Sequence, residues 1–310
     1  MYYSNNMDSV LYSQLMSHIK KVNADWLSLR KSRQYKWGLF IDEVIDDVCH
    51  FNFLRLYKSF KKWNRGKKST AIKSTVRQNI VKRKEPNYFS KERIAIYTAI
   101  LGAYDKVLEP YCIPDNCDYY IFTDQQIPQN SIWRKMEWPS ILNGMSNMEK
   151  NRYLKMHPHA LFDDYKYSIY VDGNVQIVTD LTEYINCLGD NGIGIHAHNT
   201  RSCIYDELIA VVETNRMSRA EGERYRLYIQ EKGMPQNYGL MQCSVIVREH
   251  GKTSCINIME DWWNMYMKYG KRDQLYLPFV LFRYNISVEE ITVLGNNLYN
   301  NPSFRVETHV

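Results

Sequence analysis

The sequence predicts an α/β fold in which a mostly parallel sheet is flanked by helices. From residue 94 onward, short apolar stretches alternate with longer stretches of helical periodicity. Several of the apolar stretches end directly in polar or acidic residues. In such folds ligands gather at the carboxyl ends of the strands, so these polar residues are the first candidates for a functional site.

The elements of this domain are predicted from the pattern of apolar residues. The predicted strands are 94–101, 118–124, 133–138, 167–178, 193–198 and 239–248. The predicted helices are 148–157, 180–188, 201–216, 258–268 and 273–282. The chain has no Gly-x-Gly-x-x-Gly motif and no Walker loop, which argues against a dinucleotide-binding protein or a nucleoside-triphosphatase.

The first 63 residues predict a helical appendage. Between residues 8 and 29, apolar residues recur at steps of three and four, as in an amphipathic helix. A second helix is predicted over 41–63, with basic residues towards its end. These helices are expected to form a small bundle on the main domain or a homo-oligomer contact, or else to attach the protein to a membrane surface or a partner.

Charge is distributed unevenly along the chain. Residues 55–93 carry 14 basic and two acidic side chains, a net charge of +12, whereas residues 94–310 carry 20 basic and 26 acidic side chains, a net charge of −6. The segment 64–93 is therefore predicted to be a basic linker or arm, with the domain over 94–310. The basic residues of 55–84 predict contact with an anionic membrane surface. Binding to nucleic acid is not expected.

The cellular compartment is predicted from what the sequence lacks. No window contains the ~18 uninterrupted apolar residues of a membrane span, and the first residues lack the features of a signal peptide. The seven cysteines are scattered, without a Cys-x-x-Cys pair, as expected for reduced thiols. The protein is expected in the cytoplasm, with peripheral attachment to the inner face of the membrane.

The predicted central strand, 167–178, is interrupted by Asp172-Gly-Asn174. Either Asp172 caps a turn, or it meets a cation or a donor group at the edge of the sheet, because a carboxylate is not left unpaired in a core. Around this strand, the motifs resemble the glycosyltransferase-like family once catalogued as domain of unknown function 616. The motifs that carry the resemblance lie at 97–105, 118–124, 155–159, 167–174, 198–207, 239–242, 248–250, 262–263 and 272–274.

The resemblance covers about residues 94–285 and implies a fold of the GT-A type, similar in layout to glycogenin-type transferases. In those enzymes an Asp-x-Asp motif binds Mn²⁺ and the donor diphosphate. Here Asn174 replaces the second acid, so its carbonyl oxygen would join Asp172 as a ligand of Mn²⁺ or Mg²⁺. His198 or His250 would complete the metal shell, although a single histidine is more often structural.

The resemblance also suggests contacts to a nucleotide-sugar donor. Lys155, Arg152 and Arg201 would face the phosphates, because the departing phosphate charge must be stabilised. Thr98 and Asp124, assigned to the ends of the first two strands, would contact the base and ribose, or would be turn and cap residues.

The acceptor side would contain three further residues. Asp273 and Gln274 open a predicted helix at the position of the family's late Asp-Gln, where Asp273 could also be a helix cap. Glu207 lies in the helix after Arg201 and could instead form a buried salt bridge. A carboxylate among these would act as the base of an inverting transferase, whereas a retaining one needs only a weak nucleophile or a shielding carbonyl.

The expected function is therefore transfer of a sugar from a nucleotide-diphosphate sugar to a glycan or lipid-linked saccharide, in surface polysaccharide synthesis. One alternative is metal-assisted hydrolysis with Asp172, His198 and His250 as ligands. Another is a glycan-binding or scaffold protein without catalysis. Binding and turnover of a nucleotide sugar would distinguish the three.

Overall fold

The computed structural model of the chain describes residues 9–39, 92–270 and 272–309. Its centre is a six-stranded sheet with the order β3-β2-β1-β4-β7-β6. The strands are β1 (Ile94–Ile100), β2 (Cys117–Thr123), β3 (Arg134–Met136), β4 (Tyr167–Val171), β6 (Ile193–Ala197) and β7 (Met241–Glu249). Only β7 runs against its neighbours β4 and β6, so the predicted mostly parallel sheet is confirmed.

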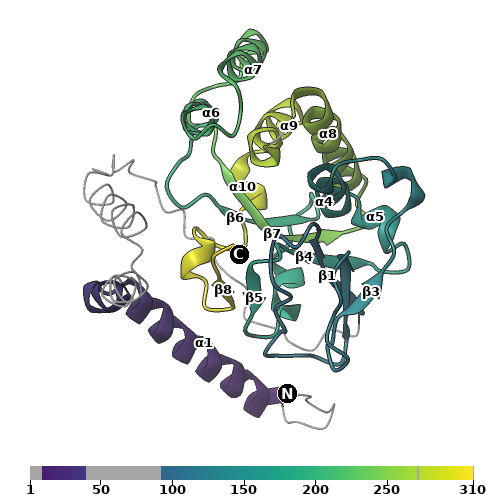
Figure 1. Cartoon of the computed structure of the whole chain (residues 1–310), viewed down its shortest axis with the longest axis vertical. Helices are drawn as coiled ribbons and strands as arrows, with labels where there is room; N and C mark the ends of the chain where they lie inside the picture. Colours follow the sequence, from purple (N-terminus) through teal and green to yellow (C-terminus); the bar gives the residue numbers. More distant parts are fainter. Residues whose placement is uncertain (1–8, 40–91, 271, 310) are drawn as a thin grey trace, which may run out of the picture.

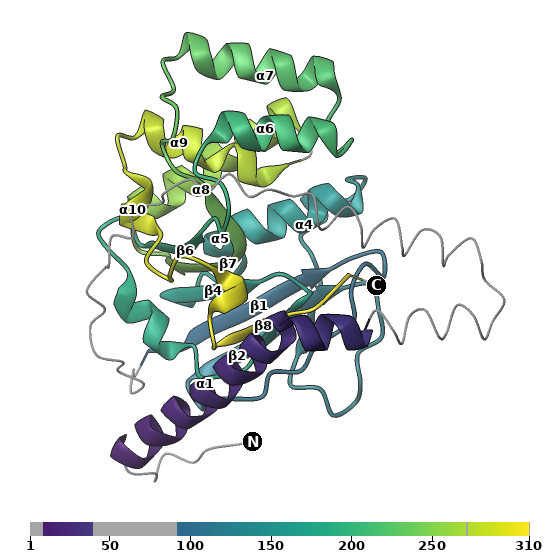
Figure 2. The same cartoon turned by 90° about the vertical axis from the view of Figure 1, so that its left-hand side faces the viewer.

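Strand β1 is buried along its whole length because both faces of the sheet are covered. Its alternate residues divide between two cores: Tyr97 packs on the helical side, whereas Ile96 packs on the opposite side. The helices of the first side lie together on one face of the sheet (Figures 1 and 2). They are α4 (Asn147–Met156), α5 (Pro158–Leu161), α6 (Ile204–Glu213), α7 (Arg219–Glu231), α8 (Thr253–Tyr269) and α9 (Leu277–Arg283).

The predicted central strand is divided into two strands that belong to different sheets. After β4, the amide of Asp172 still donates to Ser244 O in β7 (2.8 Å), and the chain then turns at Gly173. A side chain at Gly173 would not fit, because a Cβ atom there would lie 2.7 Å from Cγ1 of Ile100. β5 (Val175–Ile177) follows and pairs antiparallel with β8 (Phe304–Val306).

Most predicted helices are present, with differences at their ends. The prediction for 180–188 corresponds to a 3₁₀ helix, η2 (Thr182–Cys187), and 273–282 contains η3 (Asp273–Leu275) followed by α9. Helix α4 begins at a capping box in which Ser146 and Glu149 bond each other's backbone amides, which fixes where the helix starts. The short elements η1 (Ser140–Leu142), α10 (Val288–Ile291) and η4 (Leu298–Asn300), together with α5, α7 and β8, were not predicted.

The predicted first helix is α1 (Ser9–Lys31), which lies beside β8 in both views (Figures 1 and 2). It buries Tyr12, Met16, Asn23 and Leu27, so it packs on its own chain. The predicted helix 41–63 and nearly all of the basic segment 64–93 lie outside the described residues. Within the described ranges, no helix combines the length and apolarity needed to cross a membrane, and the six cysteines there are free thiols.

Candidate active site

Lys155 is the centre of a charged cluster at the carboxyl end of β4. Its ammonium group lies 2.9 Å from Oδ2 of Asp273 and 3.5 Å from Oδ1 of Asp172. The Lys155 and Asp273 side chains are almost fully buried, whereas 28% of the Asp172 side chain is exposed. The ammonium nitrogen also lies 5.3 Å from the centre of the Tyr170 ring. Three predicted site residues, from α4, η3 and the turn after β4, therefore converge.

Arg152, one turn earlier on α4, completes the pairing of Asp273. Its Nε atom lies 3.2 Å from Oδ1 of Asp273, so each carboxylate oxygen faces its own cation. Burial alone would raise the pKa of Asp273, but Arg152, Lys155 and Arg272 lower it well below its ordinary value. Asp273 is thus ionised at neutral pH and weakly basic. It does not cap a helix, since the N-cap residue of η3 is Arg272 and that of α9 is Tyr276.

The end of α4 that carries Lys155 is held by a buried arginine. Arg248, on β7, has no exposed surface and donates to the carbonyl oxygen of Lys155 and to the hydroxyl of Tyr97 (2.7 Å). Tyr97 in turn donates to Leu154 O at 3.1 Å. A cation at the last carbonyl groups of a helix is favourable, which gives Arg248 a structural role behind the site. Its sequence motif suggested no such role.

A second cluster is formed around Glu207 on α6, whose side chain is 3% exposed. Arg201 donates through Nε to Oε2 of Glu207, and Nη2 of Arg272 lies 3.8 Å from Oε1. Glu207 is therefore in a buried salt bridge, one of the two interpretations given by the sequence. Since Arg272 also lowers the pKa of the adjacent Asp273, the two clusters form one electrostatic unit.

This unit contains four cations and three carboxylates, so it has a net charge of +1. Its cations are Arg152, Lys155, Arg201 and Arg272, and its carboxylates are Asp172, Glu207 and Asp273. Gln274 follows directly, and its buried Nε2 atom has no hydrogen-bond partner. Nε of Arg272 is likewise buried without a hydrogen bond. Buried donors without acceptors are rare in folded proteins and indicate a place where a ligand supplies the acceptor.

The Asp172–Asn174 turn is also bonded to the far end of the described chain. Asn174 donates from Nδ2 to the carbonyl oxygen of Glu307 (2.9 Å), and the amide of Glu307 donates to Asn174 O (2.8 Å). Nearby, Nδ1 of His309 lies 2.7 Å from Oδ1 of Asp105. Burial raises the pKa of Asp105, His309 lowers it, and the Asp172 charge raises it further. Sequence reasoning missed both Asp105 and His309.

The two residues assigned to the donor base and ribose lie elsewhere on the carboxyl side of the sheet. Thr98 is inside β1 instead of at its end, and its buried hydroxyl has no hydrogen-bond partner. Asp124 follows β2 and accepts from the amide of Gly102 at 2.9 Å. Asp124 therefore fixes the turn after β1, which is the simpler of the two roles that the sequence left open.

The two histidines predicted as metal ligands do not meet Asp172. The amide of His198 donates to Leu240 O, whereas the amide of Asp172 donates to Ser244 O. These two acceptors are four positions apart in the sequence, so His198 and Asp172 lie roughly 13 Å apart in the direction of β7. His198 accepts at Nδ1 from the amide of Arg201 (3.0 Å), and burial lowers its pKa.

His250 lies at the opposite end of the sheet, where its ring nitrogens contact Ser168 Oγ (2.8 Å) and Phe162 O (3.2 Å). The reason is the direction of β7, which runs antiparallel to β4 and carries its last residue back to the start of that strand. Burial, with a contribution from Arg248, lowers the pKa of His250 to about 4, so the imidazole is neutral. The ligand set of the hydrolase alternative is thus divided between two ends of the sheet. Among the described residues, no group of three or more His, Cys, Asp or Glu side chains is placed to hold a metal ion.

The sequence and the fold were compared with those of known proteins. The family model described as "TOD1/MUCI70, glycosyltransferase-like domain" matches residues 66–305, which includes most of the basic segment as well as the predicted domain. No curated protein sequence matched the chain. Among solved structures, a chain titled "WbbM bifunctional glycosytransferase apo structure" is similar with a TM-score of 0.40 and 12% identity. The similarity covers 62% of this chain and 38% of that one.

Proposed function

Because the chain belongs to the TOD1/MUCI70 glycosyltransferase-like domain family, we propose that it transfers a sugar from a nucleotide-diphosphate sugar. The acceptor is a hydroxyl group of a glycan or lipid-linked saccharide, as in the synthesis of surface polysaccharide. The observation that carries the proposal is the placement of Lys155 between Asp172 and Asp273 at the carboxyl end of β4. Ligands of sheets of this kind bind at this edge.

The cations of the site stabilise the departing diphosphate. As the bond between the sugar and the phosphate breaks, negative charge grows on the phosphate oxygens, and fixed cations nearby lower the barrier. Lys155 has three N–H donors, of which two face Asp172 and Asp273. Asp172 is the most exposed member of this trio, so the donor approaches from its side. The net charge of +1 favours an anionic ligand.

Asp273 is a poor general base in this arrangement. A general base works best when its pKa is near the working pH, whereas the pKa of Asp273 is lowered far below that range. Its role is to hold Lys155 and Arg152 in position and to accept a hydrogen bond from the substrate. Gln274 supplies the unpaired Nε2 donor to a sugar oxygen. This division of roles favours the retaining type of transferase, which does not require a strong carboxylate base.

Mn²⁺ or Mg²⁺ binds together with the donor. The described protein groups do not form a complete metal site, but such ions are commonly bound by one or two protein oxygens and the phosphates of the substrate. Asp172 would be the main protein ligand. Asn174 donates through Nδ2 to Glu307, so its Oδ1 atom would remain available as a second oxygen ligand. The ion would neutralise part of the diphosphate charge.

Titration with nucleotide sugars tests the proposal directly. Donors are screened by thermal shift with and without Mn²⁺, and the best donor is then followed for product. A ligand present at 100 times its dissociation constant stabilises the folded protein by about 2.7 kcal/mol, which is readily measured. Binding of one donor with turnover supports the transferase, whereas binding without turnover supports the scaffold. No stabilisation by any nucleotide sugar would contradict both.

A further inference from the structure

The Asp172–Asn174 turn is connected by hydrogen bonds to a helix far away in the sequence. The link is the segment 301–309, called here the C-terminal segment, which contains β8 and the residues that bond the turn. Asn174 and Glu307 exchange two hydrogen bonds immediately beyond the pairing of β5 with β8. His309 then contacts Asp105, whose Oδ2 atom would be 3.1 Å from a Cβ atom at Gly173. The turn is therefore bordered by this segment.

Asn23 of α1 holds the C-terminal segment through its main chain. Its side chain is buried and donates from Nδ2 to the carbonyl oxygens of Pro302 (2.7 Å) and Phe304 (3.2 Å). Its Oδ1 atom accepts from Nε of Arg305 at 2.6 Å. The Arg305 guanidinium lies 4.2 Å from the centre of the Trp26 ring, one turn further along α1. A buried asparagine with all these bonds made specifies one register of α1 on β8.

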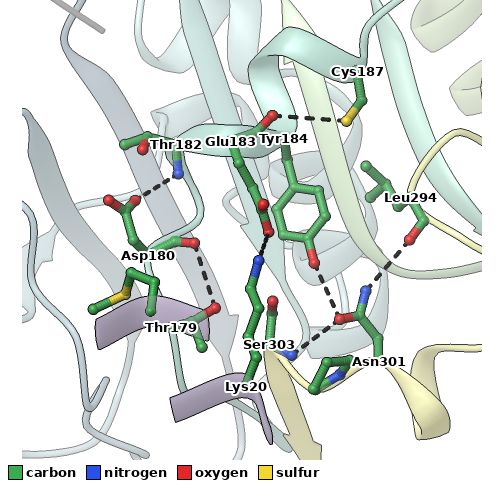
Figure 3. Close-up of polar contacts among 12 residues, drawn as sticks. Lys20, Thr179, Asp180, Thr182, Glu183, Tyr184, Cys187, Leu294, Asn301 and Ser303 are labelled. Atoms are coloured by element: carbon green, nitrogen blue, oxygen red, sulfur yellow. Dashed lines mark hydrogen bonds and ion pairs between the residues drawn. The ribbon is translucent and has the colours of Figure 1, made fainter. Parts of the chain in front are cut away.

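Further contacts hold both partners of this link. Arg30 of α1 lies 3.5 Å from Oε1 of Glu307, the residue that bonds Asn174. Figure 3 shows Lys20 of α1 paired with Glu183 of η2, beside the bonds of Asn301. Asn301 accepts at Oδ1 from the hydroxyl of Tyr184 (3.1 Å) and from the amide of Ser303 (3.0 Å).

We propose that Asn23 is a positioning residue of the active site, because it fixes the C-terminal segment and thereby the Asp172–Asn174 turn. The inference rests on the proposed function only in calling this turn the donor site. α1 is thus a working part of the transferase domain and not an appendage. The effect of Asn23 passes to the C-terminal segment and from Glu307 of that segment to Asn174.

Hydrogen exchange of the full chain tests this path without any substrate. Asn23→Ala is compared with Val22→Ala, whose side chain is 52% exposed on the same helix. Two amides report on the link: that of Glu307, which donates to Asn174 O, and that of Val178, which donates to Ser303 O. In Asn23→Ala both should exchange about tenfold faster or more, because the C-terminal segment opens locally more often. Amides of β1 should not change. Unchanged exchange at Glu307, or an equal increase throughout β1, would overturn the proposal.

A milder variant covers the case in which Asn23→Ala fails to fold. Arg30→Gln removes the partly exposed pair with Glu307 and the contact of the Arg30 guanidinium with the Trp26 ring, but leaves the bonds of Asn23 in place. This variant should also increase the exchange rate of the Glu307 amide, by a smaller factor than Asn23→Ala, and should leave the exchange of β1 unchanged. Exchange at Glu307 equal to that of the wild-type chain would contradict the link.

Binding of inorganic pyrophosphate with Mn²⁺, measured by calorimetry, separates this inference from the proposed function. Asn23→Ala should raise the dissociation constant about fivefold or more, whereas Val22→Ala should leave it unchanged. Equal binding by wild type and Asn23→Ala would overturn the positioning role. No binding by the wild-type chain would contradict the proposed donor site, while the exchange experiment would still decide the mechanical link.

Discussion

The ammonium group of Lys155 lies 2.9 Å from the carboxylate of Asp273, although 118 positions separate these residues in the sequence. Trp262 strengthens the arrangement by donating from Nε1 to the carbonyl oxygen of Asp273 at 2.7 Å. The ion pair joins α4 to η3 on the helical side of the sheet, directly beside the turn that contains Asp172. Charge, and not only packing, therefore brings these elements together.

Asp172→Ala should abolish transfer of sugar and leave the protein folded. Asp172 is partly exposed, and Lys155 would keep Asp273 as its partner. Product formation and the melting temperature are measured together. Asp164→Ala, which removes an exposed carboxylate before β4, is the matched control. Wild-type turnover in a folded Asp172→Ala protein would show that this turn is not part of the reaction.

Asn174→Asp should tighten the binding of Mn²⁺, because a second carboxylate joins Asp172 at the turn. The same change removes the Nδ2 donor to Glu307 O, so exchange at the neighbouring amides should rise. Calorimetric titration with Mn²⁺ measures the first effect. Asn174→Ala removes the same donor without adding charge and is the control. If both variants bind Mn²⁺ equally, the turn does not contact the ion.

Asp273→Asn should lower stability at neutral pH by about 3 kcal/mol, since buried Arg152 loses its anion and Lys155 keeps only the more distant Asp172. The pKa of Asp273 is lower in the folded protein than in the unfolded chain, where it is about 3.9. The ionised carboxylate therefore contributes its full stabilisation of the folded protein above that pH, and this contribution declines as the pH falls below it. Melting temperatures of wild type and variant should therefore converge below pH 4. A difference that stays constant from pH 7 to pH 3 would contradict the ionised pair.

Gln274→Ala should lower turnover by about 10²-fold and spare donor affinity, as expected for a group that acts in the transition state. The Nε2 atom of Gln274 has no protein partner, so the substitution removes no internal hydrogen bond and should leave stability unchanged. Gln236→Ala, in an exposed loop, is the control. Weaker donor binding with unchanged turnover would place Gln274 in the donor pocket. Asp273→Ala should lower turnover similarly but should also lose stability.

The basic residues of 55–84 should bind anionic lipid and take no part in the chemistry. Near an anionic leaflet each basic side chain contributes about 1 kcal/mol, and the attraction weakens with salt. Co-sedimentation with anionic and neutral liposomes compares the wild type with a variant in which seven basic residues become Gln. These are Lys61, Lys62, Lys67, Lys68, Lys82, Arg83 and Lys84. Equal binding by both proteins would disprove the prediction, and lost turnover would instead place this segment at the active site.

Local patterns in the sequence predicted the sheet, whereas the family resemblance pointed to most residues of the charged cluster. Apolar runs located the strands, and the rule for carboxyl ends drew attention to Asp172. The direction of a strand leaves no such pattern, so His250 was assigned to the wrong end of antiparallel β7. β8 has only three residues, too few for a periodic signal, and its partner α1 is remote in sequence. Contacts such as Asn23 with Pro302 depend on tertiary packing alone.

The docking of α1 on the C-terminal segment also determines when the site can form during synthesis. α1 leaves the ribosome before any strand of the six-stranded sheet, whereas residues 301–309 leave after all of them. The hydrogen bonds of Asn23 can therefore form only after Pro302 and Phe304, 279 and 281 positions later, have been synthesised. Contacts between such distant residues form slowly because the loop must first close. The sheet can fold earlier, and the nascent protein should complete the proposed donor site only as one of its last steps.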